Sequence, residues 1–193
     1  MNNPSSQKQP ATSRIPRRNE SGQAMVELSL ILLMLVVLAY GLMDFCTAIY
    51  EKQVITNLTR EGANLSARGS GGSTAQIMTN ALAAIIQEAT PLNLSTNSTS
   101  GRLILTAASN TNNAASGFYI SQQLSSGTLA ASSKIGTGVG NYAKLPSSIV
   151  AQSGHNVYIA EIYYKFNVPA PLGKLIRVNV TNQFYDVAYF PGS

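Results

Sequence analysis

The chain has 193 residues, enough for one folded domain and one appended segment but not for two full hydrophobic cores. Only 11% of its residues are charged, against about 25% in typical soluble domains, whereas 45% are apolar, so we expect the apolar residues to be concentrated in one segment. Residues 1–22 hold four cations against one acid, which is three of the five net positive charges. No basic stripe with interleaved aromatic residues follows, which argues against nucleic-acid binding.

Residues 1–22 are predicted to form a basic, disordered leader. They are polar, contain three prolines and show no hydrophobic periodicity, so they cannot bury enough apolar surface to order themselves. Arg14, Arg17 and Arg18 lie just before the apolar segment, and few cations lie just after it. Because Lys and Arg accumulate on the cytoplasmic side of membrane segments, we expect the N-terminus in the cytoplasm and the C-terminal domain outside.

The next segment is predicted to be a membrane-spanning helix at about residues 24–49. The stretch from Leu28 to Met43 contains no charge, and its Leu, Ile, Val and Met side chains would lie all round a helix rather than on one stripe. A helix over residues 23–49 rises about 40 Å, which exceeds the ~30 Å hydrocarbon core of a bilayer. We therefore expect a single-pass membrane protein.

The same helix is expected to continue beyond the membrane, so that it covers residues 23–69. Its outer half keeps apolar and small residues at helical spacing, which predicts an amphipathic stalk whose apolar face packs on something. Gly62 is expected to weaken this helix, and the Gly-Ser-Gly-Gly cluster at 69–72 is expected to end it. The residues on the predicted face are Val54, Leu58, Ala63, Leu65 and Ala67.

A short second helix is predicted near the start of the extracytoplasmic domain, residues 70–193. Ser73 and Gln76 have the Ser-x-x-Gln spacing of a capping box, in which each side chain satisfies a backbone N–H of the first turn. Pro91 closes the segment. The apolar residues that follow the box are Ile77, Ala81, Leu82, Ile85 and Ile86.

The remainder of this domain is predicted to form a small antiparallel sheet. Residues 156–166 (NVYIAEIYYKF) are rich in β-branched and aromatic residues, and residues 175–181 alternate apolar and polar side chains after a Pro/Gly turn at 169–173. We expect these two strands to form a hairpin with one solvated face. Further strands are expected at Arg102–Thr106, Phe118–Leu124 and Gln183–Phe190.

Five tyrosines of this region have two interpretations. They could form an adhesive surface, or they could pack a small sheet with their hydroxyl groups at its edge, and packing is the commoner use of such residues. These residues are Tyr158, Tyr163, Tyr164, Tyr185 and Tyr189.

The residues around the start of the apolar segment predict a processing site. Gly22 precedes the apolar run, and Glu27 is the fifth residue of the segment that begins at Gln23. Secretory signal peptides have the opposite order, with the small-residue cleavage site after the apolar run. Cleavage between Gly22 and Gln23 would remove only the basic leader and leave the helix attached to the domain, which is the arrangement of prepilins.

Glu27 is costly to place one turn into a membrane helix. One interpretation is that it lies near the membrane edge and extends to the interface. The other is that it neutralises the new α-amino group of Gln23 on a neighbouring subunit, which would set the axial stagger between packed helices.

Several short motifs lie along residues 22–63, beginning with the one that contains Gly22 and Glu27. They are Gly22-Gln-Ala-Met-Val-Glu27, Gly41-Leu-Met-Asp44-Phe45, Ala48-Ile-Tyr50-Glu-Lys-Gln53-Val54, Asn57 and Arg60-Glu61-Gly62-Ala63. In their order and spacing, residues 22–63 resemble the TadE-like family of pseudopilins, membrane proteins of tight-adherence pilus systems. The similarity covers about a fifth of the chain and matches the exported domain only loosely.

The resemblance implies a pilin-like α+β fold and a structural role, as a minor pilin or pseudopilin of a tight-adherence (Tad) type IV-like pilus, in the bacterial inner membrane. It implies that a prepilin peptidase cuts the Gly22/Gln23 bond, with Glu27 recognised first by that peptidase and later by another subunit. The implied partners are other pilins or pseudopilins, the inner-membrane platform of the pilus machinery and the lipid bilayer. The alternative is a permanently membrane-anchored extracytoplasmic binding or adhesion module.

Asp44 has two interpretations. It is either a helix residue at the outer headgroup boundary or a contact to a partner membrane helix, where an unpaired carboxylate would be costly. We expect no enzyme activity and no cofactor, because His155 is the only histidine and Cys46 the only cysteine, which leaves neither a Ser-His-Asp triad nor a metal-ligand set. The glycine-rich stretch 136–140 lacks the strand–turn–helix context of a phosphate loop and is predicted to be a flexible loop.

Overall fold

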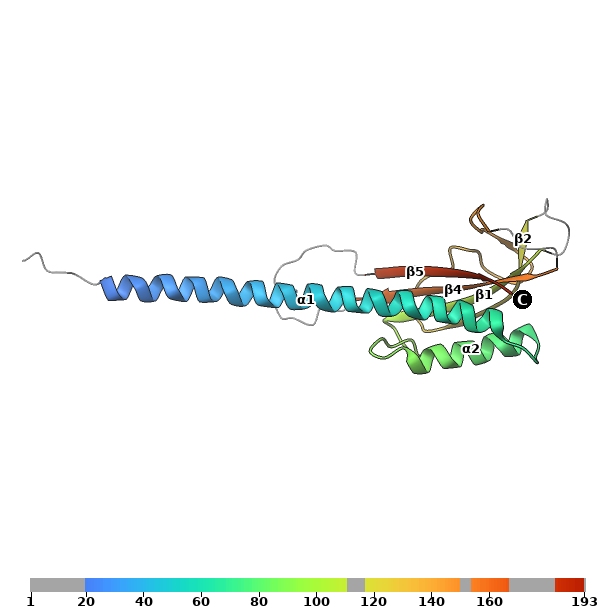
Figure 1. The fold of residues 1–193 in the computed structure, drawn as a ribbon, viewed down its shortest axis with the longest axis horizontal. Helices are drawn as coiled ribbons and strands as arrows, with labels where there is room; N and C mark the ends of the chain where they lie inside the picture. The colour runs from blue at the N-terminus through green and yellow to red at the C-terminus, as the bar shows by residue number, and fades with distance from the viewer. Residues whose placement is uncertain (1–19, 111–116, 150–153, 167–182, 193) are drawn as a thin grey trace, which may run out of the picture. The chain divides into compact units, whose positions relative to one another are not determined.

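The computed structural model describes residues 20–110, 117–149, 154–166 and 183–192. The chain divides into two compact units, Met1–Tyr40 and Gly41–Ser193. Its described elements are two helices followed by five strands (Figure 1). The predicted α+β class, with a long N-terminal helix, a short second helix and an antiparallel sheet, is confirmed.

Helix α1, Glu20–Arg68, contains the predicted membrane span. In the first unit its apolar side chains are exposed all round the helix, with Leu28 62% and Met34 72% exposed. Water solvates such a surface poorly, whereas lipid tails match it. Among the described residues, α1 is the one helix that is long and apolar enough to cross a membrane.

Local signals set the turn between the two helices. The backbone N–H of Gly69 donates to the carbonyl of Leu65 at 3.1 Å, which closes the last turn of α1. Helix α2, Thr74–Glu88, begins as predicted, because the Ser73 side chain accepts a hydrogen bond from the backbone N–H of Gln76 at 3.3 Å. A Cβ on Gly69 would collide with the side chain of Ile77, so the turn requires a glycine at this position.

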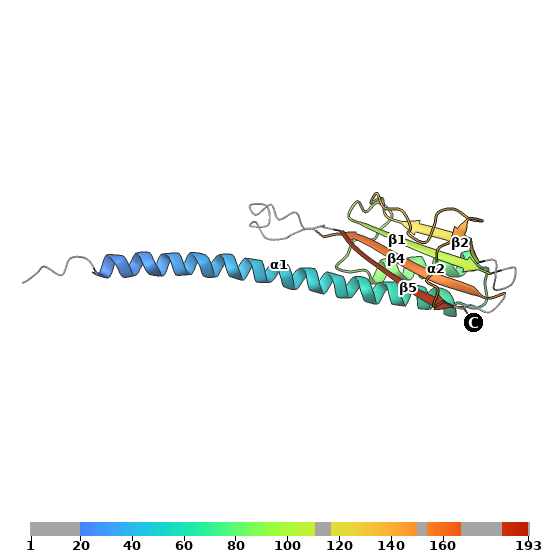
Figure 2. The same ribbon diagram turned by 90° about the horizontal axis from the view of Figure 1, so that it is seen from above.

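Five described strands form one antiparallel sheet in the order β3-β2-β1-β4-β5 (Figure 2). The strands are β1 Gly101–Ser109, β2 Phe118–Ser126, β3 Tyr142–Ala143, β4 Asn156–Lys165 and β5 Gln183–Pro191. Strand β1 pairs with β2 on one side and with β4 on the other, and β4 also pairs with β5. The centre of the sheet therefore joins two segments, β1 and β4, that are distant in the sequence.

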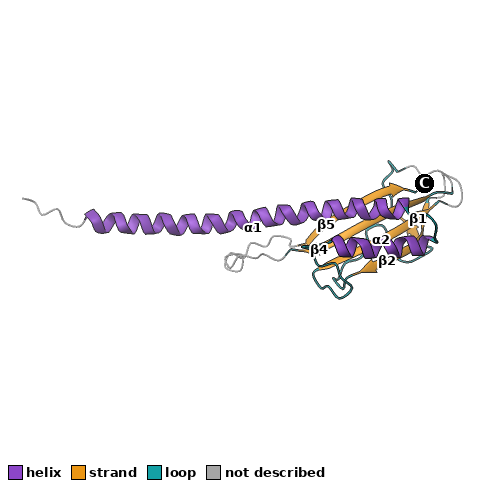
Figure 3. Ribbon diagram, turned by 60° about the horizontal axis from the view of Figure 1, so that its bottom comes forward, coloured by secondary structure: helices purple, strands orange, loops and turns teal. Residues whose placement is uncertain are grey.

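The second half of α1 and all of α2 cover one face of this sheet (Figure 3). The predicted amphipathic face of α1 is confirmed, with Leu58, Ala63 and Ala67 buried. Alternate strand residues meet this face, because successive side chains of a strand point to opposite sides. The buried cluster includes Ile55, Leu58, Ala63 and Ala67 of α1, Met78, Ala81 and Ile85 of α2, and Leu103, Leu105, Ala160 and Ile162 of the strands.

Gly62 has a role that differs from the expected one. The residue is buried, and a Cβ there would lie 2.5 Å from Cδ1 of Ile85 and 3.4 Å from Cβ of Ala160. Its helix propensity remains poor, but the missing side chain lets α1 approach α2 and β4 closely.

The opposite face, called the outer face here, is covered by the segment between β2 and β3, residues 127–141. Ile135 of this segment packs against Ile120 of β2 and Val157 and Ile159 of β4. Glu161 and Tyr163 of β4 also point to the outer face, since they alternate with Ala160 and Ile162.

One expectation about the elements is corrected. Residues 156–166 do not pair with 175–181, because both edges of β4 are occupied, by β1 and by β5. In α2 the residues Met78, Ala81 and Ile85 are buried, while Ile77, Leu82 and Ile86 are half-buried. The short strand β3 was not predicted. The turn at 169–173, the strand at 175–181 and most of the leader lie outside the described residues.

Candidate processing and assembly site

Gly22 and Gln23 lie in the first turns of α1, and their surroundings are open. An added Cβ on Gly22 would have no atom within 4 Å apart from the local helix backbone. Both residues are exposed. The bond between them is helical, so a protease that reads an extended chain has to unwind the end of α1, and helix ends fray readily.

The structure brings Gln23 and Glu27 together. Nε2 of Gln23 donates a hydrogen bond to Oε1 of Glu27 at 3.1 Å. Residues four apart on a helix lie on the same face, which explains the contact. The bond gives the carboxylate a donor within its own helix, which lowers the cost of placing it near lipid.

The surface around this pair is apolar. Leu30 and Ile31 are each 62% exposed, and they lie three and four residues after Glu27, on the same side of the helix as the pair. A charged oxygen on such a surface favours a cation or a strong donor from a neighbouring molecule wherever water is excluded. Asp44 belongs to the second unit, where it is half-buried on α1, and is not part of this group.

A second polar group, missed in the sequence, is centred on Glu161 in the middle of β4. Its side chain is fully buried, yet four donors reach the carboxylate. The backbone N–H of Lys134 donates to Oε1 at 2.9 Å, and Ser133 Oγ donates to Oε2. The hydroxyl of Tyr185 donates to Oε1 at 3.1 Å. The hydroxyl of Tyr163 shares its one hydrogen between the carbonyl of Ser132 at 2.7 Å and Oε1 at 3.3 Å.

The tyrosines of this group are packing residues, but their hydroxyl groups are not at the sheet edge as expected. The rings of Tyr163 and Tyr185 lie 4.8 Å apart, and the ammonium of Lys134 lies 3.6 Å from the centroid of the Tyr185 ring. Burial, and then the charge of Glu161, raise the pKa of Tyr163 to about 12 and raise that of Tyr185 further. Both phenols are therefore neutral donors at physiological pH. The signal in the sequence was an isolated acid inside an apolar, tyrosine-rich strand.

Polar contacts also join α1 to β5 within the second unit. Nζ of Lys52 donates to the carbonyl of Tyr185 at 3.0 Å and lies 3.7 Å from Oδ1 of Asp186. The hydroxyl of Thr59, which bonds the carbonyl of Thr56 at 3.0 Å, also lies 3.4 Å from Oδ2 of Asp186. Burial raises the pKa of Glu51, one residue before Lys52. These contacts orient the outer half of α1 on the sheet.

His155 is exposed at the start of β4 and Cys46 is exposed on α1. Among the described residues, no group of three or more His, Cys, Asp or Glu side chains lies close enough to hold a metal ion.

Residues 22–64 match the model of the family described as TadE-like protein. The resemblance predicted from the residues between Gly22 and Ala63 is thereby confirmed, and this segment of the chain is TadE-like. The match covers the span and most of the stalk of α1 and stops before α2 and the sheet. Neither a curated protein nor a solved structure matches the chain.

Proposed function

We propose that this chain is a structural component of a tight-adherence pilus system, a minor pilin or pseudopilin that is cut between Gly22 and Gln23 and packs through its N-terminal helix. The observation that carries the proposal is the Gln23–Glu27 pair at the start of a helix whose apolar side chains are exposed all round. The TadE-like match over the same residues supports it.

Processing by a prepilin peptidase is the first step of this proposal. No described atom outside the local helix lies within 4 Å of a Cβ added to Gly22, which leaves room for the peptidase at this residue. Removal of the leader gives Gln23 a free α-amino group and removes Arg14, Arg17 and Arg18, the three arginines expected to hold the N-terminus in the cytoplasm. The mature helix then begins one turn before Glu27.

Packing between subunits is the second step. The α-amino group of Gln23 carries a positive charge and can bind Glu27 of a neighbouring subunit more strongly than the neutral amide of its own Gln23 side chain does. Because the surrounding surface is apolar, an unpaired Glu27 is costly there, and this cost selects the stagger at which the two charges meet. Asp44 is proposed as a second contact along the same helix.

In this scheme the inner-membrane platform and the other pilins receive the processed helix, and the domain from residue 70 onward lies outside the cytoplasm. The test is N-terminal and intact-mass analysis of the protein purified from its native host, together with its recovery in sheared surface filaments. We expect a mature chain that begins at Gln23. Gly22→Ala should leave the leader attached, and Glu27→Ala should lower recovery in filaments or on the assembly platform by about tenfold or more.

The matched control is Glu61→Ala, which removes an exposed acid from α1 outside the apolar segment. It should leave processing and assembly unchanged. If the native chain keeps its leader and Glu27→Ala assembles as well as the parent, the proposal is wrong and the permanently anchored binding or adhesion module takes its place.

A further inference from the structure

The outer face of the sheet carries a cavity that neither processing nor helix packing uses. It has a volume of about 180 Å³ and lies between β1, β2 and the covering segment 127–141. This is well above the ~10–15 Å³ that one water molecule needs by the same measure, and it is below the ~300 Å³ of the smaller drug-sized ligand pockets. The cavity is therefore suited to one small molecule or to one residue of a polymer.

One wall of the cavity holds a cation without an acidic partner. Arg102 of β1 is half-buried, and its Nη1 donates to the carbonyl of Leu129 at a long 3.4 Å. Its Nε is buried and has no hydrogen-bond partner. The one ion pair within 4.0 Å among the described residues joins Lys52 to Asp186, so no carboxylate neutralises Arg102 there. A half-buried guanidinium with no carboxylate beside it favours an anion.

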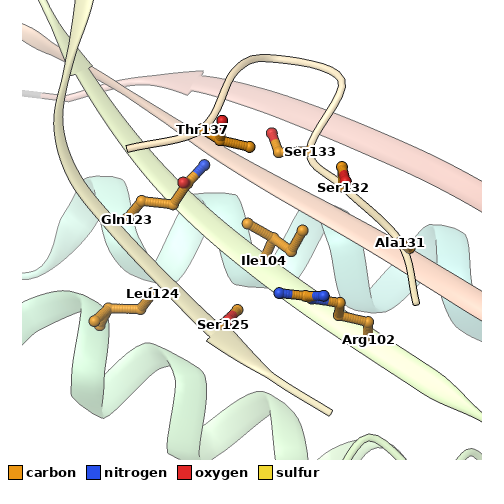
Figure 4. A pocket seen from close by; sticks show the side chains of 9 residues that line it. All are labelled: Arg102, Ile104, Gln123, Leu124, Ser125, Ala131, Ser132, Ser133 and Thr137. Carbon is orange, nitrogen blue, oxygen red and sulfur yellow. The ribbon is translucent and has the colours of Figure 1, made fainter. Parts of the chain in front are cut away.

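Free hydroxyl groups form the opposite rim. Figure 4 shows Arg102 extending along the sheet toward Ile104 and Ser125, with the segment that carries Ser132 and Thr137 beyond them. The hydroxyl groups of Ser125, Ser132 and Thr137 make no hydrogen bond to any described residue, and all three residues are exposed. Ile104 gives the floor an apolar patch. Hydroxyl donors and acceptors around an apolar floor match a sugar ring, which is polar at its edge and apolar on its faces.

The remaining polar groups of the cavity are already engaged. Gln123 uses its amide N–H groups on Thr106 and on the carbonyl of Gly136, and its oxygen accepts from the backbone N–H of Gly138. Glu161 lies on the same face, and its carboxylate accepts hydrogen bonds from four donors, which stabilise its charge in place. These contacts hold the covering segment against the sheet, so the cavity is preformed.

We infer that this cavity binds a carboxylated monosaccharide of the hexuronate class, with its carboxylate on the guanidinium of Arg102 and its hydroxyl groups on Ser125, Ser132 and Thr137. A planar guanidinium binds a carboxylate through two parallel hydrogen bonds, which a neutral sugar cannot accept. The ligand is either a free sugar acid or the terminal residue of an acidic polysaccharide. This inference is independent of whether the chain enters a filament.

The test is a titration of the full chain in lipid nanodiscs with D-galacturonate, in which binding is measured by isothermal titration calorimetry or saturation-transfer NMR. D-galactose is the matched neutral sugar. We expect saturable binding of galacturonate, with galactose weaker by about tenfold or more because it lacks the carboxylate. Trigalacturonate that binds as well as the monomer identifies a polysaccharide end as the source, whereas binding of the monomer alone identifies a free sugar acid.

Variants tie the binding to the cavity. Arg102→Met should lower the affinity for galacturonate by about tenfold or more. Lys144→Met, which removes an exposed cation elsewhere in the domain, should leave this affinity unchanged. If Arg102→Met does not fold, the double variant Ser125→Ala/Ser132→Ala decides, because both residues are exposed, and we expect it to weaken binding by about threefold or more. No saturable binding up to about 10 mM galacturonate, equal binding of galactose, or no effect of the folded cavity variants overturns the inference.

Discussion

A carboxylate that is fully buried in the centre of a sheet, as Glu161 is, has to be matched by donors, because an unmatched charge there costs several kcal/mol. Ser133 and Lys134 supply two of those donors from the covering segment, and Tyr163 and Tyr185 supply two from the strands. The charge therefore joins three separate parts of the chain. Glu161 functions as an anchor of the outer face.

Replacing this residue should show how much the anchor contributes. Glu161→Ala removes the acceptor of Ser133, Lys134 and Tyr185, while Tyr163 keeps the carbonyl of Ser132, so we expect the free energy of unfolding of the domain to fall by about 2–4 kcal/mol. The measurement is thermal or denaturant unfolding of the full chain in detergent, followed by near-UV circular dichroism. Glu61→Ala, at an exposed position of α1, is the control. A loss no larger than that of the control would show that the anchor is dispensable.

The tyrosines beside Glu161 predict a stability that falls at alkaline pH. The pKa of Tyr163 is raised to about 12 by burial and by Glu161, against about 10 in an unfolded chain. Between these values the unfolded state releases a proton that the folded state keeps, so folding is less favourable as pH rises from about 10 to about 12. Tyr163→Phe should make this decline shallower in unfolding curves measured across that range.

The decline is not expected to vanish in Tyr163→Phe, because burial also raises the pKa of Tyr164, Tyr185 and Tyr189. Tyr142→Phe, which removes an exposed phenol from β3, is the matched control. A pH dependence of Tyr163→Phe that superimposes on that of the parent would contradict the assignment.

At the scale of elements, α1 combines two different surfaces in one continuous helix. Its first part presents apolar side chains in every direction, which suits lipid or other apolar helices. From Ile55 onward it buries one stripe and exposes the rest, as a helix on a sheet does. The small residues Gly62, Ala63 and Ser66 on that stripe allow a close approach to the sheet and to α2.

Gly62 provides a test of this close approach. Gly62→Ala places a methyl group 2.5 Å from Cδ1 of Ile85, whereas Ile85→Val removes that atom. We therefore expect the two changes to be coupled, with Gly62→Ala less destabilising by about 1 kcal/mol in the Ile85→Val background than in the parent. Unfolding free energies of the four proteins of this double-mutant cycle give the coupling. Additive effects would mean that α1 and α2 adjust without strain.

For the whole molecule, the long apolar helix predicts a single-pass membrane anchor, and the arginines before it predict its orientation. Protease added to spheroplasts should digest the domain that follows residue 70 and leave an N-terminal fragment of the unprocessed Gly22→Ala variant protected. The reason is that the arginines predict a leader on the cytoplasmic side. Immunoblotting against a tag at the N-terminus detects the fragment. If the added protease removes the tag from intact spheroplasts, the N-terminus lies outside and the predicted topology is wrong.

The sequence by itself determined the features that depend on neighbouring residues. The length and all-round apolarity of residues 24–49 predicted the span, the Ser73–Gln76 spacing predicted the start of α2, and the Gly22–Glu27 spacing pointed to the TadE-like match. The predicted ranges of the described strands β1, β2, β4 and β5 were close to the observed ones for the same reason, since the alternation of side chains along a strand is local.

Only the tertiary structure decided the features that depend on residues far apart in the chain. The pairing of β1 with β4 follows from how the two helices and the covering segment bury both faces of the sheet, and no local pattern encodes it. The same holds for Gly62 against Ile85, for the four donors around Glu161, and for the cavity beside Arg102. In each case the free energy comes from contacts that exist only after the chain has packed.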